Sequence, residues 1–296
     1  MEHYNIIVYR YGSICEPDVI SAFQTLGMTV YEVAVEITEK NHMPSYKMKH
    51  LLTLLQNTDL HFEFVFSINF FPYVSELCNK LHVMYLSWIV DCPVTELFSV
   101  AIKNQNNRIF VFDRIQYQRI QPYNPDRIFY LPLATNVKRW DKQLDSITEE
   151  DKKAYSTDVS FVGSLYHEKS PLSILKKNEI LDEYWEGYIQ GICEAQLKIY
   201  GYNFLEEVIP DTLIECLKQK FRNMIFCQNM IGDIERYIVA NDFVGMRVSE
   251  QERIQTLNEI AKDRKVVLYT RSDTKLLNKV DCRPGVTTHM QMPKIF

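Results

Sequence analysis

Three acidic side chains follow apolar runs of this sequence and could take a proton from a hydroxyl substrate: Asp91, Asp113 and Glu16. In open parallel sheets, ligands bind outside the carboxyl ends of the strands, so a carboxylate there is placed for general-base chemistry. Asp91 stands at the end of its run, just before a predicted helix over 93–103, and is the first choice. Asp91 is equally suited to cap that helix, and Asp113 to form a surface ion pair with Arg114.

Three further side chains near the same loops are candidates for binding a hydroxyl-bearing acceptor: Tyr11, Asn69 and Trp88. Tyr11 follows the first apolar run, Asn69 follows the third, and Trp88 lies near the end of the fourth. Asn69 is equally suited to cap a helix. Aromatic residues make up 12% of the chain, and most of them are expected in the core.

The candidates for binding a phosphate-bearing donor lie further along the chain: Gly163, Ser164, Leu165, His167 and Arg271. A glycine and a hydroxyl residue directly after a strand let backbone amides approach a phosphate. The spacing around Gly163 matches neither a dinucleotide-binding fingerprint nor a Walker loop, so a tight turn without ligand explains it as well. Arg271 follows another apolar run. Its guanidinium could bind a diphosphate, or it could be an arginine exposed to solvent without a ligand.

The elements that must position these residues alternate regularly over the first half of the chain. Apolar runs typical of buried parallel strands occupy residues 5–9, 29–37, 62–68, 83–90, 108–112 and 127–131. Apolar stripes at helical spacing separate most of them, as in Val19, Ile20 and Phe23. Strands alternating with helices in short units predict a parallel sheet, and therefore a Rossmann-like domain over 1–137.

The second half predicts a different arrangement. Residues 138–157 are polar and charged, as in a linker between domains. A fresh strand at 158–165 starts a second α/β domain over 158–296, and a strand returns at 265–270. Between them, residues 171–262 carry helical periodicity almost throughout, which predicts a helical insertion.

Composition narrows the class of protein. Hydrophobic residues make up 46% of the 296 residues and charged residues 24%, as in globular proteins, and the net charge of -5 gives no reason to expect a nucleic-acid partner. The seven cysteines form no CxxC pair, which favours reduced thiols in a cytoplasmic protein. The sequence has no signal-peptide pattern and no run long enough to span a bilayer, so only peripheral membrane contact stays open.

Five runs together resemble a known family. They are FSINF at 66–70, YLSWIVDCP at 85–93, VFDR at 111–114, LPLATN at 131–136 and DVSFVGSL at 158–165. In this order they are similar to the CgeB-like, group 1-type bacterial glycosyltransferases of GT-B architecture. The resemblance implies two Rossmann-like domains facing a cleft, the first binding the acceptor and the second a nucleotide sugar. It implies no metal or other cofactor, because positive side chains and a helix N-terminus stabilise the leaving diphosphate.

The sequence departs from this family in two places. His167-Glu168-Lys169 stands where many members have a basic residue shortly after the glycine loop. The family's later donor-binding strands have no counterpart before Phe296, so we expect the second domain to be incomplete and its nucleotide binding to be weak. Two alternatives therefore stand beside a glycosyltransferase: an inactive sugar- or nucleotide-binding remnant, and a GT-B-like nucleotide-sugar epimerase.

Overall fold

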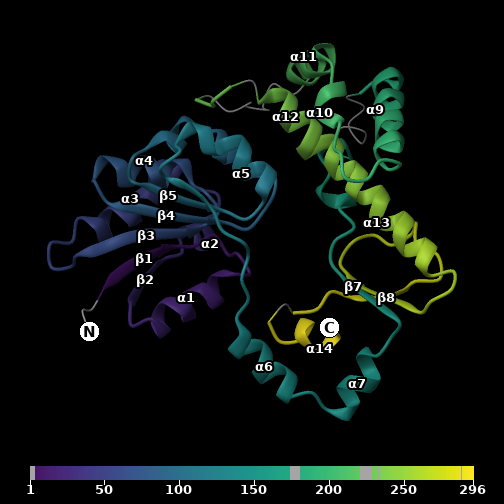
Figure 1. The fold of residues 1–296 in the computed structure, drawn as a ribbon, viewed down its shortest axis with the longest axis horizontal. Coiled ribbons are helices and arrows are strands. Elements are labelled where there is room, and N and C mark those ends of the chain that lie inside the picture. The colour runs from purple at the N-terminus through teal and green to yellow at the C-terminus, as the bar shows by residue number, and fades with distance from the viewer. Residues whose placement is uncertain (1–3, 174–180, 221–228, 233, 288) are drawn as a thin grey trace. The chain divides into compact units, whose positions relative to one another are not determined.

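The computed structural model describes residues 4–173, 181–220, 229–232, 234–287 and 289–296 of the chain (Figure 1). The chain divides into two units, Met1–Asn136 with Cys227–Gly232, and Val137–Phe226 with Asp233–Phe296. The first unit contains a six-stranded parallel sheet, which confirms the mixed α/β class and is consistent with a Rossmann-like fold.

The sheet of the first unit has the strand order β2-β1-β3-β4-β5-β6. Its strands are β1 (Asn5–Tyr9), β2 (Thr29–Val33), β3 (Phe62–Ile68), β4 (Met84–Ile89), β5 (Asn107–Val111) and β6 (Ile128–Tyr130). Its helices are α1 (Glu16–Thr25), α2 (Val35–Thr38), α3 (Pro44–Leu55), α4 (Pro72–Lys80) and α5 (Arg114–Ile120), with the 3-10 helices η1 (Thr95–Phe98), η2 (Val100–Lys103) and η3 (Gln121–Tyr123). Residues 229–232 join this unit through an antiparallel bridge between Ser99 and Met230.

Burial on both faces explains why the strands are almost continuously apolar. All residues of β1 from Ile6 to Tyr9 are at most 1% exposed. On one face, Ile6 and Val8 join Ile20 of α1 in a hydrophobic cluster, and Figure 1 shows α3 and α4 on the other side of the strands. A strand covered by helices on both faces needs apolar side chains at every position.

Two predicted elements of the first unit differ in the structure. The apolar run 29–37 forms β2 only to Val33, and α2 begins at Val35, because an apolar run alone does not separate strand from helix. The predicted helix over 93–103 forms η1 and η2 instead. Ser99 interrupts it, because its backbone is extended and its side chain accepts a hydrogen bond from the amide of Ala101.

The second unit carries a three-stranded parallel sheet in the order β7-β8-β9. Its strands are β7 (Val159–Val162), β8 (Val266–Thr270) and β9 (Asp281–Pro284). Its described helices are α6 (Val137–Asp145), α7 (Glu149–Tyr155), η4 (His167–Lys169), α9 (Glu183–Gln196), α10 (Leu205–Val208), α11 (Asp211–Lys220), α12 (Glu235–Ile238), the π-helix η5 (Val239–Gly245), α13 (Met246–Ile260) and α14 (Met292–Ile295). The helices between β7 and β8 agree with the helical segment predicted there; residues 174–180, 221–228 and 233 lie outside the described part.

The segment predicted as a linker, 138–157, contains α6 and α7 within the second unit. Thr148 starts α7 with a capping box, since its hydroxyl accepts from the amide of Asp151 and the Asp151 carboxylate accepts from the amide of Thr148. Lys294 of α14 forms an ion pair with Asp151 at 2.9 Å. A polar surface helix held by caps and ion pairs has a linker-like composition, so composition alone does not distinguish the two.

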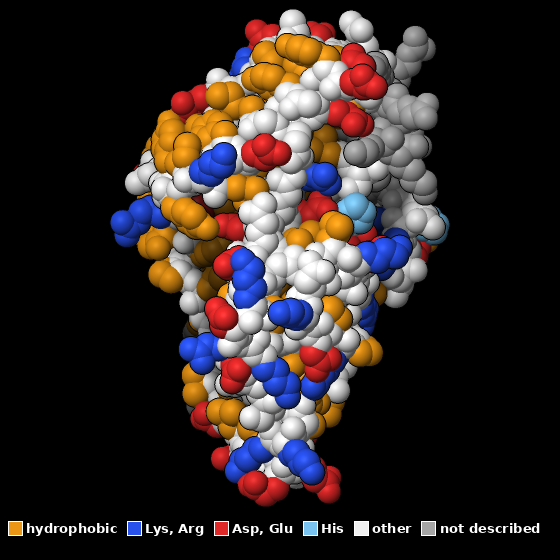
Figure 2. Space-filling model, turned by 90° about the vertical axis from the view of Figure 1, so that its right-hand side faces the viewer, with side chains coloured by type: hydrophobic (Ala, Val, Ile, Leu, Met, Phe, Trp, Pro, Cys, Tyr) orange, Lys and Arg blue, Asp and Glu red, His pale blue; other side chains and the backbone are white. Residues whose placement is uncertain are grey.

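Figure 2 shows one face of the molecule, on which acidic and basic side chains are interspersed among hydrophobic ones. The described part of that face carries no large patch of one charge sign. Over the described residues, none of the helices combines the length and the apolar character that crossing a membrane requires.

A partly buried polar cluster lies at the carboxyl ends of β1 and β2. The hydroxyls of Tyr9 and Tyr73 donate to Oε1 of Glu36 at 2.6 and 2.5 Å, and Nζ of Lys47 donates to its Oε2 at 2.5 Å. Burial alone would raise the pKa of Glu36, but the hydrogen bonds from Lys47, Tyr73 and Tyr9 outweigh it and lower the pKa below its ordinary value. Burial, and after it the hydrogen bond to the same carboxylate, raises the pKa of both tyrosines.

Because the pKa of Glu36 is lower in the folded protein, the charged carboxylate stabilises the fold above its ordinary pKa of about 4.5, and this contribution is lost as the pH falls through the folded value. Glu36→Gln should therefore lower the free energy of unfolding at pH 7 by about 1.5–3 kcal/mol, the range for hydrogen bonds to charged groups. Urea unfolding at pH 7, 5 and 3.5 should show this loss shrinking with acidity. A loss independent of pH would contradict the assignment.

Candidate functional site

The strand order of the first unit defines where a ligand is expected. The chain passes from β1 to β2 on one side of the sheet and then to β3, β4, β5 and β6 on the other. The loops after β1 and β3 therefore leave the sheet in opposite directions, and the crevice between them is where open α/β sheets bind ligands. Tyr11 lies in the first of these loops and Asn69 in the second, so two of the predicted acceptor residues stand at this switch point.

Asn69 links three of the predicted site residues. Its Nδ2 donates to the hydroxyl of Tyr11 at 3.0 Å and to Oδ2 of Asp91 at 2.6 Å, while its Oδ1 accepts from the amide of Val90 at 3.1 Å. Its backbone has a φ of 56°, in the left-handed region that asparagine tolerates better than most residues. The structure therefore brings the ends of β1, β3 and β4 together through one amide side chain.

Asp91 is exposed and is not the cap of a helix, because η1 begins only after Val94. Oδ2 of its carboxylate accepts from Asn69, and among the described residues Oδ1 has no hydrogen-bond partner. Burial of the ring, together with the carboxylates of Asp91 and Glu16, raises the pKa of Tyr11, so its hydroxyl keeps its proton at neutral pH. The carboxylate of Asp91 can accept a proton from a substrate, and the phenol hydroxyl of Tyr11 can donate a hydrogen bond to the same substrate.

Glu16 has a structural role in place of the general-base role considered above. The residue is 1% exposed, and its Oε1 accepts from the amides of Tyr11, Gly12 and Ser13 at 2.8, 3.0 and 3.1 Å. Its Oε2 accepts from Nε of Arg10 at 3.0 Å. These contacts shape the loop after β1, and Glu16 thereby positions Tyr11 without facing a substrate.

Asp113 and Trp88 also serve the fold. Asp113 is the N-cap of α5, since its carboxylate accepts from the amide of Gln116 at 2.7 Å. The side chain of Trp88 packs against the hydrophobic cluster around Ile6 and Ile68, and its backbone oxygen accepts from the amide of Asn69 at 2.8 Å. The ring of Trp88 therefore packs against the core. The backbone of Trp88 contacts the crevice by accepting the hydrogen bond from Asn69.

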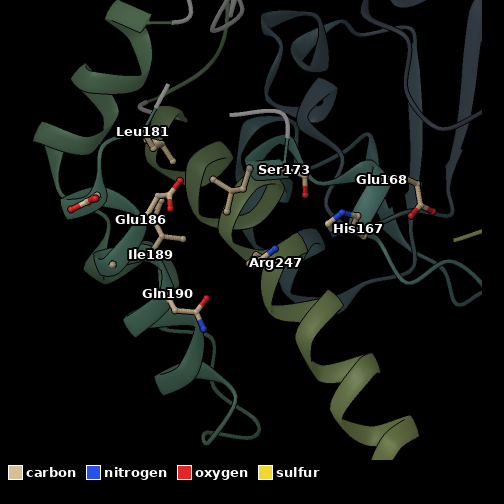
Figure 3. Close-up of a pocket in the computed structure, with 11 residues that line it drawn as sticks. His167, Glu168, Ser173, Leu181, Glu186, Ile189, Gln190 and Arg247 are labelled. Carbon is tan, nitrogen blue, oxygen red and sulfur yellow. The ribbon is translucent and has the colours of Figure 1, made fainter. Parts of the chain in front are cut away.

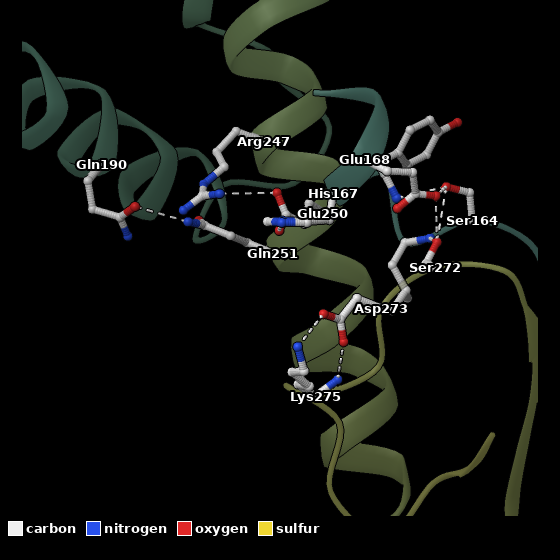
Figure 4. A network of polar contacts seen from close by, with 12 residues as sticks. Ser164, His167, Glu168, Gln190, Arg247, Glu250, Gln251, Ser272, Asp273 and Lys275 are labelled. Atoms are coloured by element: carbon white, nitrogen blue, oxygen red, sulfur yellow. Dashed lines mark hydrogen bonds and ion pairs between the residues drawn. The ribbon is translucent and has the colours of Figure 1, made fainter. Parts of the chain in front are cut away.

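The predicted donor loop after β7 is closed by its own side chains. The hydroxyl of Ser272 accepts from the amide of Leu165 at 2.8 Å, and the hydroxyl of Ser164 accepts from the amide of Tyr166 at 2.9 Å. Both hydroxyls donate to Oε1 of Glu168, at 2.7 and 2.9 Å (Figure 4). Two amides that a phosphate would need are thus already bonded within the loop.

Glu168 carries a negative charge at this position. Burial alone would raise its pKa, but the hydrogen bonds from Ser272 and Ser164 and the nearby charge of Lys169 outweigh it and lower the pKa. Arg253 stacks over the ring of Tyr166 with its guanidinium carbon 4.2 Å from the centroid, and donates to the backbone oxygen of Ser164. Several side-chain contacts therefore hold this loop, and a carboxylate lies where a phosphate was predicted.

The other predicted donor residues have separate places in the second unit. The side chain of Leu165 is 1% exposed in the core with Leu257 and Leu268, so only its backbone belongs to the loop. Gly163 continues the sheet, since its amide donates to the oxygen of Tyr269 at 3.1 Å. Arg271 is exposed at the end of β8, at the same edge of the sheet as Ser164.

A pocket of about 930 Å³ lies beside this loop, and sequence reasoning did not find it. Figure 3 shows it between α9 on one side and η4 and α13 on the other. Among the described residues its lining is His167, Glu168, Leu172, Ser173, Leu181, Glu183, Glu186, Gly187, Ile189, Gln190 and Arg247. His167, predicted as a donor-binding residue, lies in this lining. The glycines Gly187 and Gly191, in successive turns of an otherwise helical stretch, are too weak a signal to mark a pocket.

The sequence matches no protein-family model, and a search of curated proteins gives no match. Within the part of the chain that the structure describes, no three His, Cys, Asp or Glu side chains are grouped so as to hold a metal ion. The chemistry of the candidate site at the switch point is therefore inferred from the geometry of its side chains alone.

Proposed function

We propose that this protein transfers a hexose from a nucleotide sugar to a hydroxyl of a glycan, a protein or a small molecule. The observation that carries the proposal is the convergence of Tyr11, Asn69 and Asp91 at the switch point of the first sheet. The five ordered runs that resemble GT-B glycosyltransferases support it, with the acceptor on the first unit and the donor on the second.

In this scheme the oxygen of the acceptor hydroxyl attacks the anomeric carbon of the donor sugar. At the same time, the carboxylate of Asp91 takes the proton of that hydroxyl. The bond from that carbon to the diphosphate oxygen breaks, and the nucleoside diphosphate leaves with the electron pair. Asn69 holds Asp91 in place, and the protonated hydroxyl of Tyr11 donates a hydrogen bond to the acceptor. Arg271, at the edge of the second sheet, is the side chain suited to the departing diphosphate.

Release of nucleoside diphosphate from a panel of uridine, guanosine and thymidine diphosphate sugars, with glycan and small hydroxyl acceptors, tests the proposal. Release that requires an acceptor is the expected result. An isomerised nucleotide sugar without release would favour the epimerase. No product from any donor would overturn the transfer reaction.

A nucleotide- or sugar-binding protein without transferase activity is the second candidate. Glu168 favours this second candidate. Its charged carboxylate accepts hydrogen bonds from the hydroxyls of Ser164 and Ser272, which are the groups that a donor phosphate would contact. Two negative groups at contact distance repel by about 1 kcal/mol in water and by about 4 kcal/mol in a less polar surface site. Transfer therefore requires Glu168 to move or to be neutralised when the donor binds.

Glu168→Gln should tighten the binding of uridine diphosphate by about tenfold or more, because it removes this repulsion and retains a hydrogen-bonding side chain. Calorimetric titration of the wild type and the variant measures the change. Glu259→Gln is the matched control, since Glu259 is an exposed glutamate of α13 paired with Lys262. Equal affinities of Glu168→Gln and the wild type would show that the diphosphate does not bind at this loop.

A further inference from the structure

The pocket beside η4 has two walls of different chemistry. Figure 3 shows Glu186, Ile189 and Gln190 reaching from α9 toward Ser173 and Arg247 on the other side. Leu172, Leu181 and Ile189 add apolar surface to the lining. A volume of about 930 Å³, with apolar side chains and a few converging polar groups, is typical of a small-molecule site.

The positive side chains of the pocket are already matched by a buried carboxylate. Glu250 is 3% exposed, and it accepts from Nδ1 of His167 at 2.8 Å and from Arg247 at 3.2 Å (Figure 4). The wall on α9 adds the carboxylates of Glu183 and Glu186. The described lining therefore has no surplus of positive charge to offer a phosphate or a diphosphate.

Polar atoms near the pocket lack partners. The hydroxyl oxygen of Ser173, which lines it, is buried without a hydrogen bond among the described residues. The same holds for Oε1 of Gln251, whose Nε2 donates to Gln190 of the lining at 3.0 Å. An unsatisfied buried polar group costs about 1–3 kcal/mol, so such atoms usually mark the place of a ligand or water.

We propose that this pocket binds an uncharged, hydroxyl-rich molecule, a mono- or disaccharide, at a site separate from the switch point of the first sheet. A sugar hydroxyl can donate to the hydroxyl oxygen of Ser173, and it accepts from the guanidinium of Arg247. The C–H face of a sugar ring packs against apolar side chains such as Ile189 and Leu172. The inference goes beyond the proposed transfer reaction, because it requires only binding.

Two glycines of α9 provide the test. Gly187 lines the pocket, and a Cβ added there meets no atom within 4 Å, so a larger side chain can start from this position toward the cavity. Gly191, one turn further along α9, has the same free space but is not part of the described lining. Leucine is a better helix former than glycine, so Gly187→Leu and Gly191→Leu should both fold.

Saturation-transfer NMR and calorimetric titration with glucose, maltose, uridine diphosphate and inorganic phosphate give the readout. We expect maltose or glucose to bind, Gly187→Leu to weaken that binding by about tenfold or more through loss of the space, and Gly191→Leu to leave it unchanged. Sugar binding that survives Gly187→Leu would overturn the site. No sugar binding, or binding of only the anions, would overturn the ligand class. None of these outcomes depends on nucleoside diphosphate release, so the two proposals fail separately.

Discussion

Asp91→Asn should lower the rate of nucleoside diphosphate release about a hundredfold or more, the contribution usual for a general base. Asparagine has the shape of aspartate and keeps an oxygen that can accept from Nδ2 of Asn69, which lies 2.6 Å from the carboxylate in the wild type. Asp91 is exposed, so the substitution leaves no buried group unpaired. The loss should therefore be in turnover, and the melting temperature should stay near that of the wild type.

Steady-state turnover with a saturating donor measures this effect. Asp59→Asn is the matched control, because it makes the same chemical change on an exposed residue. Asp59 precedes β3, at the amino-terminal ends of the strands and opposite the proposed site. If Asp91→Asn retains most of the turnover of Asp59→Asn, the carboxylate is only a hydrogen-bond acceptor for Asn69. A loss in both variants would point to a general effect of charge.

Glu16→Ala should lower the free energy of unfolding of the first unit by about 3 kcal/mol, because it leaves three backbone amides without their acceptor. The substitution takes the acceptor from the amides of Tyr11, Gly12 and Ser13 and leaves Arg10 with Glu32 as its acidic partner. A domain is stable by only about 5–15 kcal/mol, so this loss is a large fraction of the total. The melting temperature should fall by roughly 10 °C.

Urea unfolding followed by circular dichroism tests this expectation, and Glu16→Gln gives the graded comparison. Glutamine keeps a side-chain oxygen for the three amides but loses the charge that Arg10 contacts, so its destabilisation should be clearly smaller. Equal unfolding midpoints for Glu16→Ala and the wild type would show that water replaces the carboxylate and that Glu16 does not shape the loop.

The two halves of the proposed reaction differ in how well the structure supports them. The residues assigned to the acceptor meet at one point, because Asn69 contacts both Tyr11 and Asp91. The loop assigned to the donor is satisfied internally by Glu168 and Ser272. Nucleotide binding by Glu168→Gln therefore decides whether the second unit takes a donor phosphate at this loop.

Much of the architecture follows from the sequence by itself. The apolar runs that form β1, β3, β4, β5 and β6 are readable because a strand buried on both faces needs apolar residues throughout. Their alternation with helical stripes predicts a parallel sheet, and the sheet in turn places Tyr11, Asn69 and Asp91 at one edge. Local pattern is sufficient for these features because burial and periodicity are properties of neighbouring residues.

Only the tertiary structure decided which side chain has which role. Asn69 and Asp91 are 22 residues apart and Asn69 and Tyr11 are 58 apart, so no local pattern announces their contacts. In the same way, the carboxylate of Glu168 reaches Ser272, 104 residues away, and the pocket forms where α9, η4 and α13 meet. Hydrogen bonds and cavities depend on which elements are neighbours in space, and that is set by packing over the whole unit.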